Sequence, residues 1–157
     1  WALDRIIPDC IKALEADKPI EIRSPRAIRP WQHVLEPLSG YLLLAQKAYE
    51  EPAIYAEAWN FGPKSDSVAT VWDVAQQVVS AYGSGKLTDA SDQQTVHEAR
   101  LLMLDISKAK FRLKWEPTLN IDETVRLTVD WYKRYKSEPV YELCMEQIRY
   151  YENRMNK

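Results

Sequence analysis

Glycine, cysteine and histidine are all scarce in this sequence of 157 residues. Its four glycines, at positions 40, 62, 83 and 85, cannot form the glycine-rich loop that cradles a nucleotide phosphate. The two cysteines, Cys10 and Cys144, lack CxxC or CxxxC spacing, and only two histidines accompany them. This pattern argues against a zinc site or a disulfide framework, and it predicts a protein of the reducing cytoplasm.

Long apolar runs and an excess of one charge are also missing. The longest purely apolar run, from Tyr41 to Ala45, is far shorter than a membrane-spanning helix requires. The 21 basic and 23 acidic residues give a net charge of -2, so no overall field attracts nucleic acid or an anionic membrane. A hydrophobic content of 46% is enough to bury a core, which excludes intrinsic disorder.

The start of the chain has neither an initiator methionine nor a secretory signal. Charged residues near Trp1, namely Asp4, Arg5 and Asp9, interrupt any apolar stretch of the kind that a signal peptide contains. Together with the missing phosphate loop, this start predicts a fragment whose catalytic or cofactor-binding half lies elsewhere. We expect one compact unit without internal repeats.

Apolar spacing predicts a mostly helical α/β unit. Helices are expected over residues 3–16, 36–51, 71–82, 122–136 and 140–155, with a shorter one ending near residue 113. Thr70 is the expected N-cap of the third helix, and Asn120 or Asp122 that of the fourth. In the helix over 36–51, one face is shared by Leu38, Tyr41, Leu42, Ala45 and Tyr49.

Three or four short strands complete the predicted fold. Alternating or short apolar segments indicate strands at 20–23, 31–34, 58–62 and 100–104. The last of these is ambiguous between a strand and a buried helix, because a short apolar run fits both.

A cluster of arginines is the first candidate binding element. Arg23, Arg26 and Arg29 lie within seven residues, bracketed by Pro25 and Pro30. Prolines fix the backbone angle φ and stiffen a loop, and a guanidinium offers a planar fork of donors that matches a phosphate. Judged by their spacing alone, such arginines more often lie in a solvated or salt-bridged surface loop than in a binding site.

Several segments carry a more specific signal. The block Arg29-Pro-Trp-Gln-His-Val-Leu-Glu36 is similar to an Arg-Asp-aromatic-x-x-Val-x-Asp signature, with Pro30 and Glu36 at the two Asp positions. This signature is typical of extended short-chain dehydrogenases/reductases acting on nucleotide sugars, which the chain resembles over nearly its whole length. Three further matching segments follow in the same order, at residues 59–63, 97–109 and 113–117.

The resemblance implies the C-terminal, substrate-binding lobe of a Rossmann-type enzyme, most similar to the CDP-sugar dehydratases. In that branch NAD serves as a hydride shuttle while a hexose loses water across C5 and C6, giving a 4-keto-6-deoxy sugar for lipopolysaccharide synthesis. NAD would be bound by an N-terminal Rossmann domain that this chain lacks. The implied partners are a small nucleotide sugar, that domain and, in the complete protein, a second copy, with no nucleic acid and no membrane.

The resemblance also assigns substrate contacts residue by residue. Arg29 would clamp the diphosphate, with Arg5 and Asn60 near the same phosphates or the sugar. Glu21 and Arg23 would flank the pyrimidine base, the first through backbone groups and the second through its guanidinium plane. No catalytic residue and no metal ligand is expected in this chain.

The remaining candidates have competing explanations. His97 matches a position that would complete the phosphate pocket, but an ordinary surface histidine explains it equally well. Tyr132 and Lys136 have the Tyr-x-x-x-Lys spacing of a catalytic pair, yet they lie on a late helix, so we interpret the first as helix face and the second as solvated. Three tryptophans are expected in the core or in site walls, namely Trp31, Trp59 and Trp115.

Two other functions stay open. The substrate lobe alone does not fix the reaction, so a dTDP-, GDP- or UDP-sugar dehydratase or an epimerase is an alternative. The second alternative is a non-catalytic module that packs on a partner through its tyrosine-rich C-terminal helix.

Overall fold

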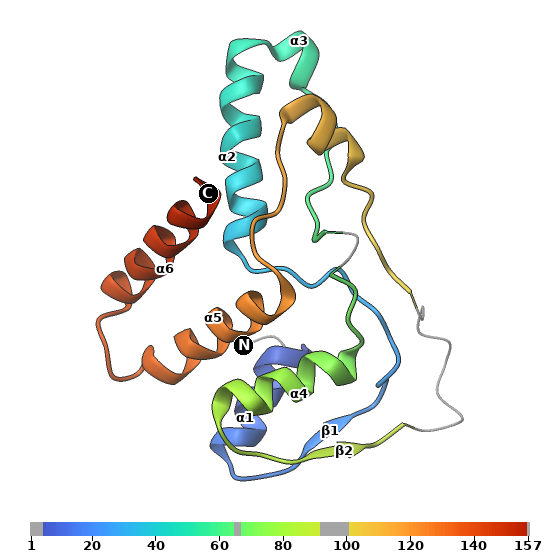
Figure 1. Cartoon of the computed structure of the whole chain (residues 1–157), viewed down its shortest axis with the longest axis vertical. Coiled ribbons are helices and arrows are strands. Elements are labelled where there is room, and N and C mark those ends of the chain that lie inside the picture. Colours follow the sequence, from blue (N-terminus) through green and yellow to red (C-terminus); the bar gives the residue numbers. More distant parts are fainter. Residues whose placement is uncertain (1–4, 65–66, 92–100, 157) are drawn as a thin grey trace.

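The computed structural model describes residues 5–64, 67–91 and 101–156. Helices α1, α4 and α5 and a two-stranded sheet form the lower part of the molecule in Figure 1, and α2, α3 and η1 rise from it as an arm. Helix α6 returns from the end of α5 to the base of α2. The elements are α1 (Ile6–Glu15), β1 (Ile20–Ile22), α2 (Leu35–Glu50), α3 (Pro52–Tyr55), α4 (Val71–Tyr82), β2 (Leu87–Asp89), the π-helical turn η1 (Ala109–Leu113), α5 (Ile121–Arg134) and α6 (Val140–Met155).

The main core lies between the sheet and helices α1, α4 and α5. Strands β1 and β2 pair in parallel, with Ile20 opposite Leu87 and Ile22 opposite Asp89. Both isoleucines are buried, and they pack in one cluster with apolar side chains of the three helices. Each such buried aliphatic side chain contributes about 1.5–3 kcal/mol to stability. The members from the helices are Cys10, Leu14, Val74, Ala75, Val78, Val125 and Val129.

The predicted helices are confirmed, and local chemistry explains their ends. Thr70 and Asp73 form a reciprocal capping box at the start of α4, and Asn120 and Glu123 form another at the start of α5. Gly83 ends α4 with a φ of 98°, a conformation that suits glycine. The first helix begins at Ile6, with Pro8 in its first turn, where a missing N–H does no harm.

Two strands are present in the described residues, where three or four were expected; the mostly helical α/β class is confirmed. The prediction of strands at 31–34 and 58–62 is wrong, because within the described parts of the chain neither segment is a strand or has one beside it. Their anchors are side-chain bonds: the Trp31 indole N–H donates to the Ala69 carbonyl, and the Gln32 amide donates to the Phe61 carbonyl. Of the segment 100–104, residue 100 lies outside the described residues, and Leu101 forms an isolated bridge to Ile28.

Helix α2 packs on the rest of the arm through a glycine. A Cβ atom on Gly40 would collide with the ring of Phe61. The absence of a side chain lets that ring lie against the helix, where it meets Trp115 edge to face, with 5.0 Å between centroids. Phe61 and Trp115 form a second apolar cluster with Ala109 and Leu113.

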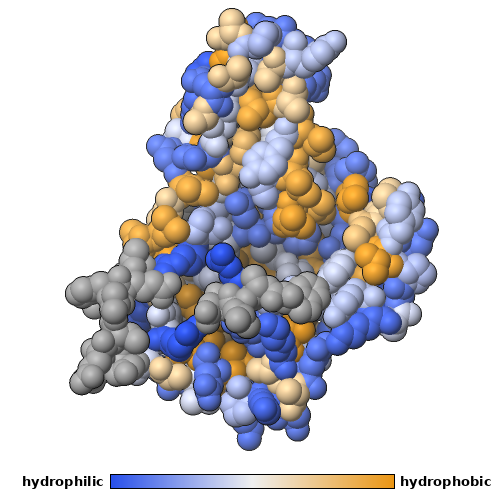
Figure 2. Space-filling view, turned by 180° about the vertical axis from the view of Figure 1, so that it is seen from behind, coloured by the Kyte–Doolittle hydropathy of each residue, from blue (hydrophilic) through white to orange (hydrophobic). Residues whose placement is uncertain are grey.

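The opposite, apolar face of α2 is exposed. Leu42 is 74% exposed and Tyr49 is 91% exposed, and Leu38 and Tyr41 also face solvent. In the view from behind, apolar side chains lie at the surface of the arm (Figure 2). The buried residues of this helix are Glu36 and Gly40, so hydrophobicity alone does not tell which face packs inward.

A buried carboxylate joins three distant parts of the chain. Glu36 is 1% exposed. Its Oε1 accepts hydrogen bonds from the backbone N–H groups of Thr118 and Leu119 at 2.9 and 2.6 Å. Its Oε2 accepts the hydroxyl hydrogen of Tyr151 at 2.8 Å. Burial raises the pKa of Tyr151 to about 12, so this phenol stays a donor. Glu36 thereby holds α2, the segment before α5, and α6 together.

We predict that Glu36→Ala lowers the free energy of unfolding by about 3 kcal/mol, because it leaves buried donors without an acceptor. Urea unfolding followed by circular dichroism measures this. Glu152→Ala, at an exposed position of α6, is the control and should change stability by less than about 0.5 kcal/mol. Equal effects of the two substitutions would contradict the role of Glu36.

A second prediction concerns pH. Burial lowers the pKa of His33 from 6.5 to about 4, and its Nδ1 accepts the Leu35 N–H at 3.3 Å. Between pH 6.5 and pH 4 the His33 imidazole is therefore protonated in the unfolded chain but stays neutral in the folded chain. Full stability is present above pH 6.5, and it falls by about 1.4 kcal/mol per unit as the pH drops toward 4.

His33→Asn keeps an acceptor of similar reach and removes the titration. The difference in unfolding free energy between the original chain and this variant should shrink from pH 7.5 to pH 5. All other titrating groups are shared by the two proteins, so a difference that does not change with pH would refute this assignment.

Candidate functional site

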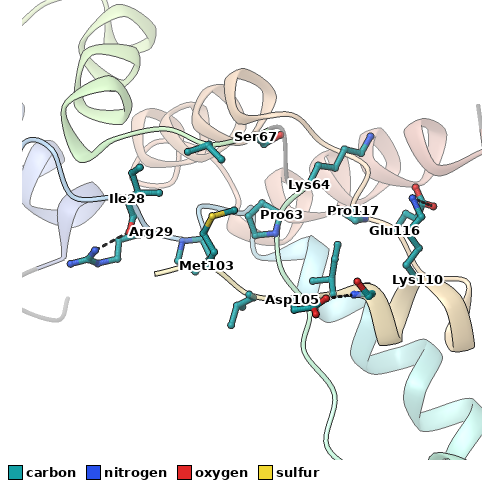
Figure 3. Close-up of a pocket in the computed structure, with 15 residues that line it drawn as sticks. Ile28, Arg29, Pro63, Lys64, Ser67, Met103, Asp105, Lys110, Glu116 and Pro117 are labelled. Carbon is teal, nitrogen blue, oxygen red and sulfur yellow. Dashed lines mark hydrogen bonds and ion pairs between the residues drawn. The ribbon is translucent and has the colours of Figure 1, made fainter. Parts of the chain in front are cut away.

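A cleft of about 400 Å³ opens where the arm meets the lower part of the molecule. It collects residues from segments far apart in the sequence, and the backbone at its rim is mostly irregular loop (Figure 3). Such a junction is a common place for a small-molecule site. The lining residues are 28–30, 63–64, 67–68, 103–107, 110 and 116–117.

Charged side chains lie at the two ends of the cleft. Arg29 is at one end, where its guanidinium donates to the Ile28 carbonyl at 2.8 Å and points away from Lys110 and Glu116 (Figure 3). Those two residues form an ion pair of 2.9 Å at the other end. Lys64 adds a further cation to the lining. The Lys64 side chain points away from Arg29 (Figure 3), so the cations of the lining are spread along the cleft and do not gather at one end.

Asp105 supplies the other negative charge of the lining. Its Oδ1 accepts the Ser107 backbone N–H at 2.8 Å, and this hydrogen bonding holds the pKa of the carboxyl below its usual range. The Asp105 carbonyl accepts from the Asn60 side-chain amide at 3.4 Å. Asp105 therefore shapes the start of the short helix, and its backbone ties Asn60 to the cleft wall.

The structure brings only some of the predicted site residues together. Arg29 lines the cleft, and Asn60 reaches its wall through Asp105 without lining it. Arg5 lies exposed at the amino end of α1, Glu21 lies on the exposed side of β1, and Arg23 follows that strand directly. His97 lies outside the described residues.

Sequence analysis missed three cleft residues. Lys64 follows the Gly62-Pro63 turn, Lys110 is two residues beyond the Ser-Lys pair of the family segment, and Glu116 lies just before Pro117. Each was close to a recognised motif, so proximity to these motifs was an available signal. Their charges face one cleft only because segments about 50 residues apart fold against each other.

Nothing in the described residues fits a dinucleotide or a metal ion. Gly83 and Gly85 join a helix to a strand, whereas a pyrophosphate loop joins a strand to a helix. The described part of the chain holds no group of three or more His, Cys, Asp or Glu side chains arranged for a metal. No described helix has the length and apolar character that crossing a membrane requires.

The tryptophans and the Tyr-x-x-x-Lys pair make contacts that belong to packing and to the surface. Trp115 is buried, and Trp59 stacks on Tyr55 at the arm. Burial raises the pKa of Tyr132, the opposite of what an activated tyrosine requires. Lys136 forms an exposed ion pair with Glu15 at 2.6 Å. These contacts agree with the interpretation of Tyr132 as a residue of the helix face and of Lys136, two residues beyond the end of α5, as a solvated residue.

A second cavity, of about 590 Å³, lies between the loop before α2 and helices α4, α5 and α6. Its walls are mainly apolar and include Trp31, Trp131 and Tyr132. Its lining contains no Lys, Arg, Asp or Glu, and buried His33 is neutral at physiological pH. It therefore offers nothing that recognises a phosphate, and the charged cleft is the better candidate.

Comparison with known proteins shows which sequences and folds this chain resembles. No family model matches the chain. A curated relative, CDP-glucose 4,6-dehydratase from Salmonella typhimurium, is 42% identical over 135 residues, which make up 86% of this chain and 38% of the relative. The chain thus spans about two fifths of the length of that relative.

Solved structures show the same fold. UDP-glucuronic acid 4-epimerase from Bacillus cereus, in complex with UDP-glucuronic acid and NAD, superposes with a TM-score of 0.69 at 22% identity, over 84% of this chain and 40% of the epimerase. dTDP-glucose 4,6-dehydratase from Bacillus anthracis, in complex with NAD, gives a TM-score of 0.67 at 20% identity, over 85% and 40% of the two chains. The resemblance to extended short-chain dehydrogenases acting on nucleotide sugars is confirmed, and the fold is that of their C-terminal portion.

Proposed function

We propose that this chain binds the CDP part of CDP-glucose and holds the hexose for NAD-dependent 4,6-dehydration by a complete enzyme. The observation that carries this proposal is Arg29 in the lining of the cleft, within the block where the chain resembles nucleotide-sugar enzymes. The 42% identity to a CDP-glucose 4,6-dehydratase supports CDP over other nucleotides.

The charge distribution favours a diphosphate near Arg29. Arg29 lies on a loop stiffened by Pro25 and Pro30. Its guanidinium bonds to the Ile28 carbonyl and points away from the other labelled lining residues (Figure 3), and in this proposal it turns toward the diphosphate when the ligand binds. Lys64 adds a second cation farther along the lining, and Asp105 disfavours an anion beside its own carboxylate (Figure 3). A guanidinium matches phosphate oxygens with two parallel donors, which fixes orientation as well as affinity.

The other predicted contacts extend from this point. Glu21 and Arg23 stand on and just after β1, on the stretch that leads into the Arg29 loop, and we assign them to the pyrimidine base. Asn60, held by the Asp105 carbonyl, and Arg5, at the start of α1, are assigned to the phosphates or the sugar. His97 is proposed to complete the phosphate pocket.

In this proposal the chain supplies binding energy and no catalytic group. Interactions with the nucleotide, remote from the reacting carbons, position C4, C5 and C6 of the hexose. NAD supplies hydride transfer when it is bound, and we assign its binding to an N-terminal Rossmann domain of the complete enzyme. We propose that this enzyme is a cytoplasmic lyase that acts in deoxysugar and lipopolysaccharide synthesis and forms a homodimer.

A related function is the main competitor. The solved relatives include a UDP-sugar epimerase and a dTDP-sugar dehydratase, and their fold does not distinguish the reactions. Titration of the chain with CDP, UDP, dTDP and GDP decides between them. The proposal expects the tightest binding for CDP, and tighter binding of any of the others would move the assignment to that nucleotide.

We predict that Arg29→Ala weakens CDP binding by the isolated chain at least tenfold in calorimetry, because one charge-assisted hydrogen bond to phosphate contributes about 1.5–3 kcal/mol. In the complete enzyme the same change should lower kcat/KM at least tenfold. Arg149→Ala, at an exposed position of α6, is the matched control and should leave affinity unchanged.

Two results would contradict the proposal. An unchanged affinity for CDP after Arg29→Ala would show that Arg29 does not clamp the diphosphate. Equal affinity for CDP and for inorganic phosphate would show that Glu21 and Arg23 form no base pocket. A chain that ignores all four nucleotides yet self-associates would instead support the non-catalytic interaction module.

A further inference from the structure

We infer that Tyr151, on the C-terminal helix α6, is a positioning residue for the substrate-binding cleft. It holds residues 115–119, called the 115–119 wall below, so that nucleotide binding and the packing of α6 strengthen each other. The inference rests on the proposed function for its ligand. It gives a role to α6, which lies outside all the segments that carry the family resemblance.

Two residues of the 115–119 wall, Glu116 and Pro117, line the cleft, and the residue before them is anchored. Trp115 is buried, and its indole N–H donates to the Ser39 hydroxyl at 2.9 Å. The backbone N–H of Trp115 donates to the Ala109 carbonyl at 3.2 Å. Because side chain and backbone are both bonded, Trp115 fixes the point from which the two lining residues start.

The residues after the lining pair are anchored by Glu36. The backbone N–H groups of Thr118 and Leu119 donate to its carboxylate, as described above. Bonds to backbone groups hold the main chain itself, so Pro117 cannot shift without disturbing them. Glu36 and Ser39 lie three residues apart in α2, on one face of the helix. Both ends of the lining pair are therefore held by the same face of α2.

Tyr151 connects the two anchors. Helix α6 lies beside the base of α2 (Figure 1), and the Tyr151 side chain is buried there. Its hydroxyl donates to Glu36 Oε2 at 2.8 Å, and the hydroxyl oxygen lies 3.0 Å from Ser39 Oγ. Removing this hydroxyl takes a donor from a buried carboxylate and a neighbour from Ser39, so both anchors weaken together. Tyr151 thus acts on the cleft through Glu36 and Ser39.

The attachment of α6 is weak enough to respond to a ligand. Its buried residues form one narrow stripe, Leu143, Gln147 and Tyr151, and two of the three are polar. An ion pair from Arg134 to Glu146, whose carboxylate is exposed, adds little. If packed α6 favours the bound nucleotide, then linkage requires that the nucleotide favours packed α6 by the same factor.

The first experiment needs no ligand. Tyr151→Phe removes the hydroxyl and keeps the ring in its cluster with Leu119. We expect the Trp115 indole N–H and the Thr118 amide to exchange about fivefold faster in this variant, because each is bonded to an anchor that has lost a hydrogen bond. Hydrogen exchange followed by nuclear magnetic resonance measures both rates.

Tyr150→Phe is the matched control. It removes a hydroxyl from the adjacent residue of α6, where the hydroxyl donates to Glu123 at 3.1 Å and has no bond to the 115–119 wall among the described residues. Both exchange rates should stay at their original values in this variant. If Tyr151→Phe also leaves them there, α6 does not hold the wall and the inference is overturned.

The second experiment is calorimetric titration of the chain with CDP. Tyr151→Phe should weaken binding about fivefold, as the loss of one hydrogen bond allows, and Tyr150→Phe should leave the affinity unchanged. Ser39→Ala should also weaken binding. The double variant Ser39→Ala/Tyr151→Phe should lose less than the product of the two single losses, because both side chains act on one wall. Independent losses would contradict that shared route.

The third experiment tests reciprocity. Saturating CDP should slow amide exchange over residues 147–151 in the original chain and leave it unchanged in Tyr151→Phe. A slowing by packing alone would not depend on CDP. If CDP binds the original chain but neither its affinity nor α6 exchange responds as stated, the proposed function stands and the inference falls.

The opposite outcome is equally distinct. If the original chain binds none of CDP, UDP, dTDP and GDP, the proposed function is refuted. Faster exchange of the Trp115 indole and the Thr118 amide in Tyr151→Phe would then still support Tyr151 as the residue that positions the 115–119 wall.

Discussion

The Glu36 carboxylate is the interaction on which the arrangement of this molecule depends. Its two oxygens accept from the backbone at Thr118 and Leu119 and from the Tyr151 hydroxyl. Helix α6, the wall of the cleft at Glu116-Pro117, and α2 are thereby fixed relative to one another. A buried carboxylate is costly without such partners, so the contact specifies one geometry rather than several.

That geometry also decides the orientation of α2. Glu36 and Gly40 lie inward, where one forms the buried network and the other accommodates the Phe61 ring. The apolar face must then point outward. On the inward side Leu43 and Leu44 also pack on the second apolar cluster, whereas Leu38, Tyr41, Leu42 and Tyr49 are exposed.

In the function proposed above, this chain binds the nucleotide and another domain of the complete enzyme performs the chemistry. Arg29, Lys64 and Asp105 supply charge at a loop junction, and none of them is placed as a nucleophile or a base. Binding energy from a remote nucleotide lowers the reaction barrier only if the reacting sugar is held against its cofactor.

Local chemistry allowed the sequence by itself to determine the helices, their capping boxes at Thr70 and Asn120, the stiff arginine loop and the family resemblance. Those features depend on residues within a few positions of one another, which is the range over which helical period and capping act. Tertiary structure alone decided which face of α2 is buried, that segments 31–34 and 58–62 lack strand partners, and that Arg29 lines a cleft from which Arg5 is absent. These outcomes follow from contacts such as Glu36 with Thr118, 82 residues apart, and no local pattern encodes a partner that distant.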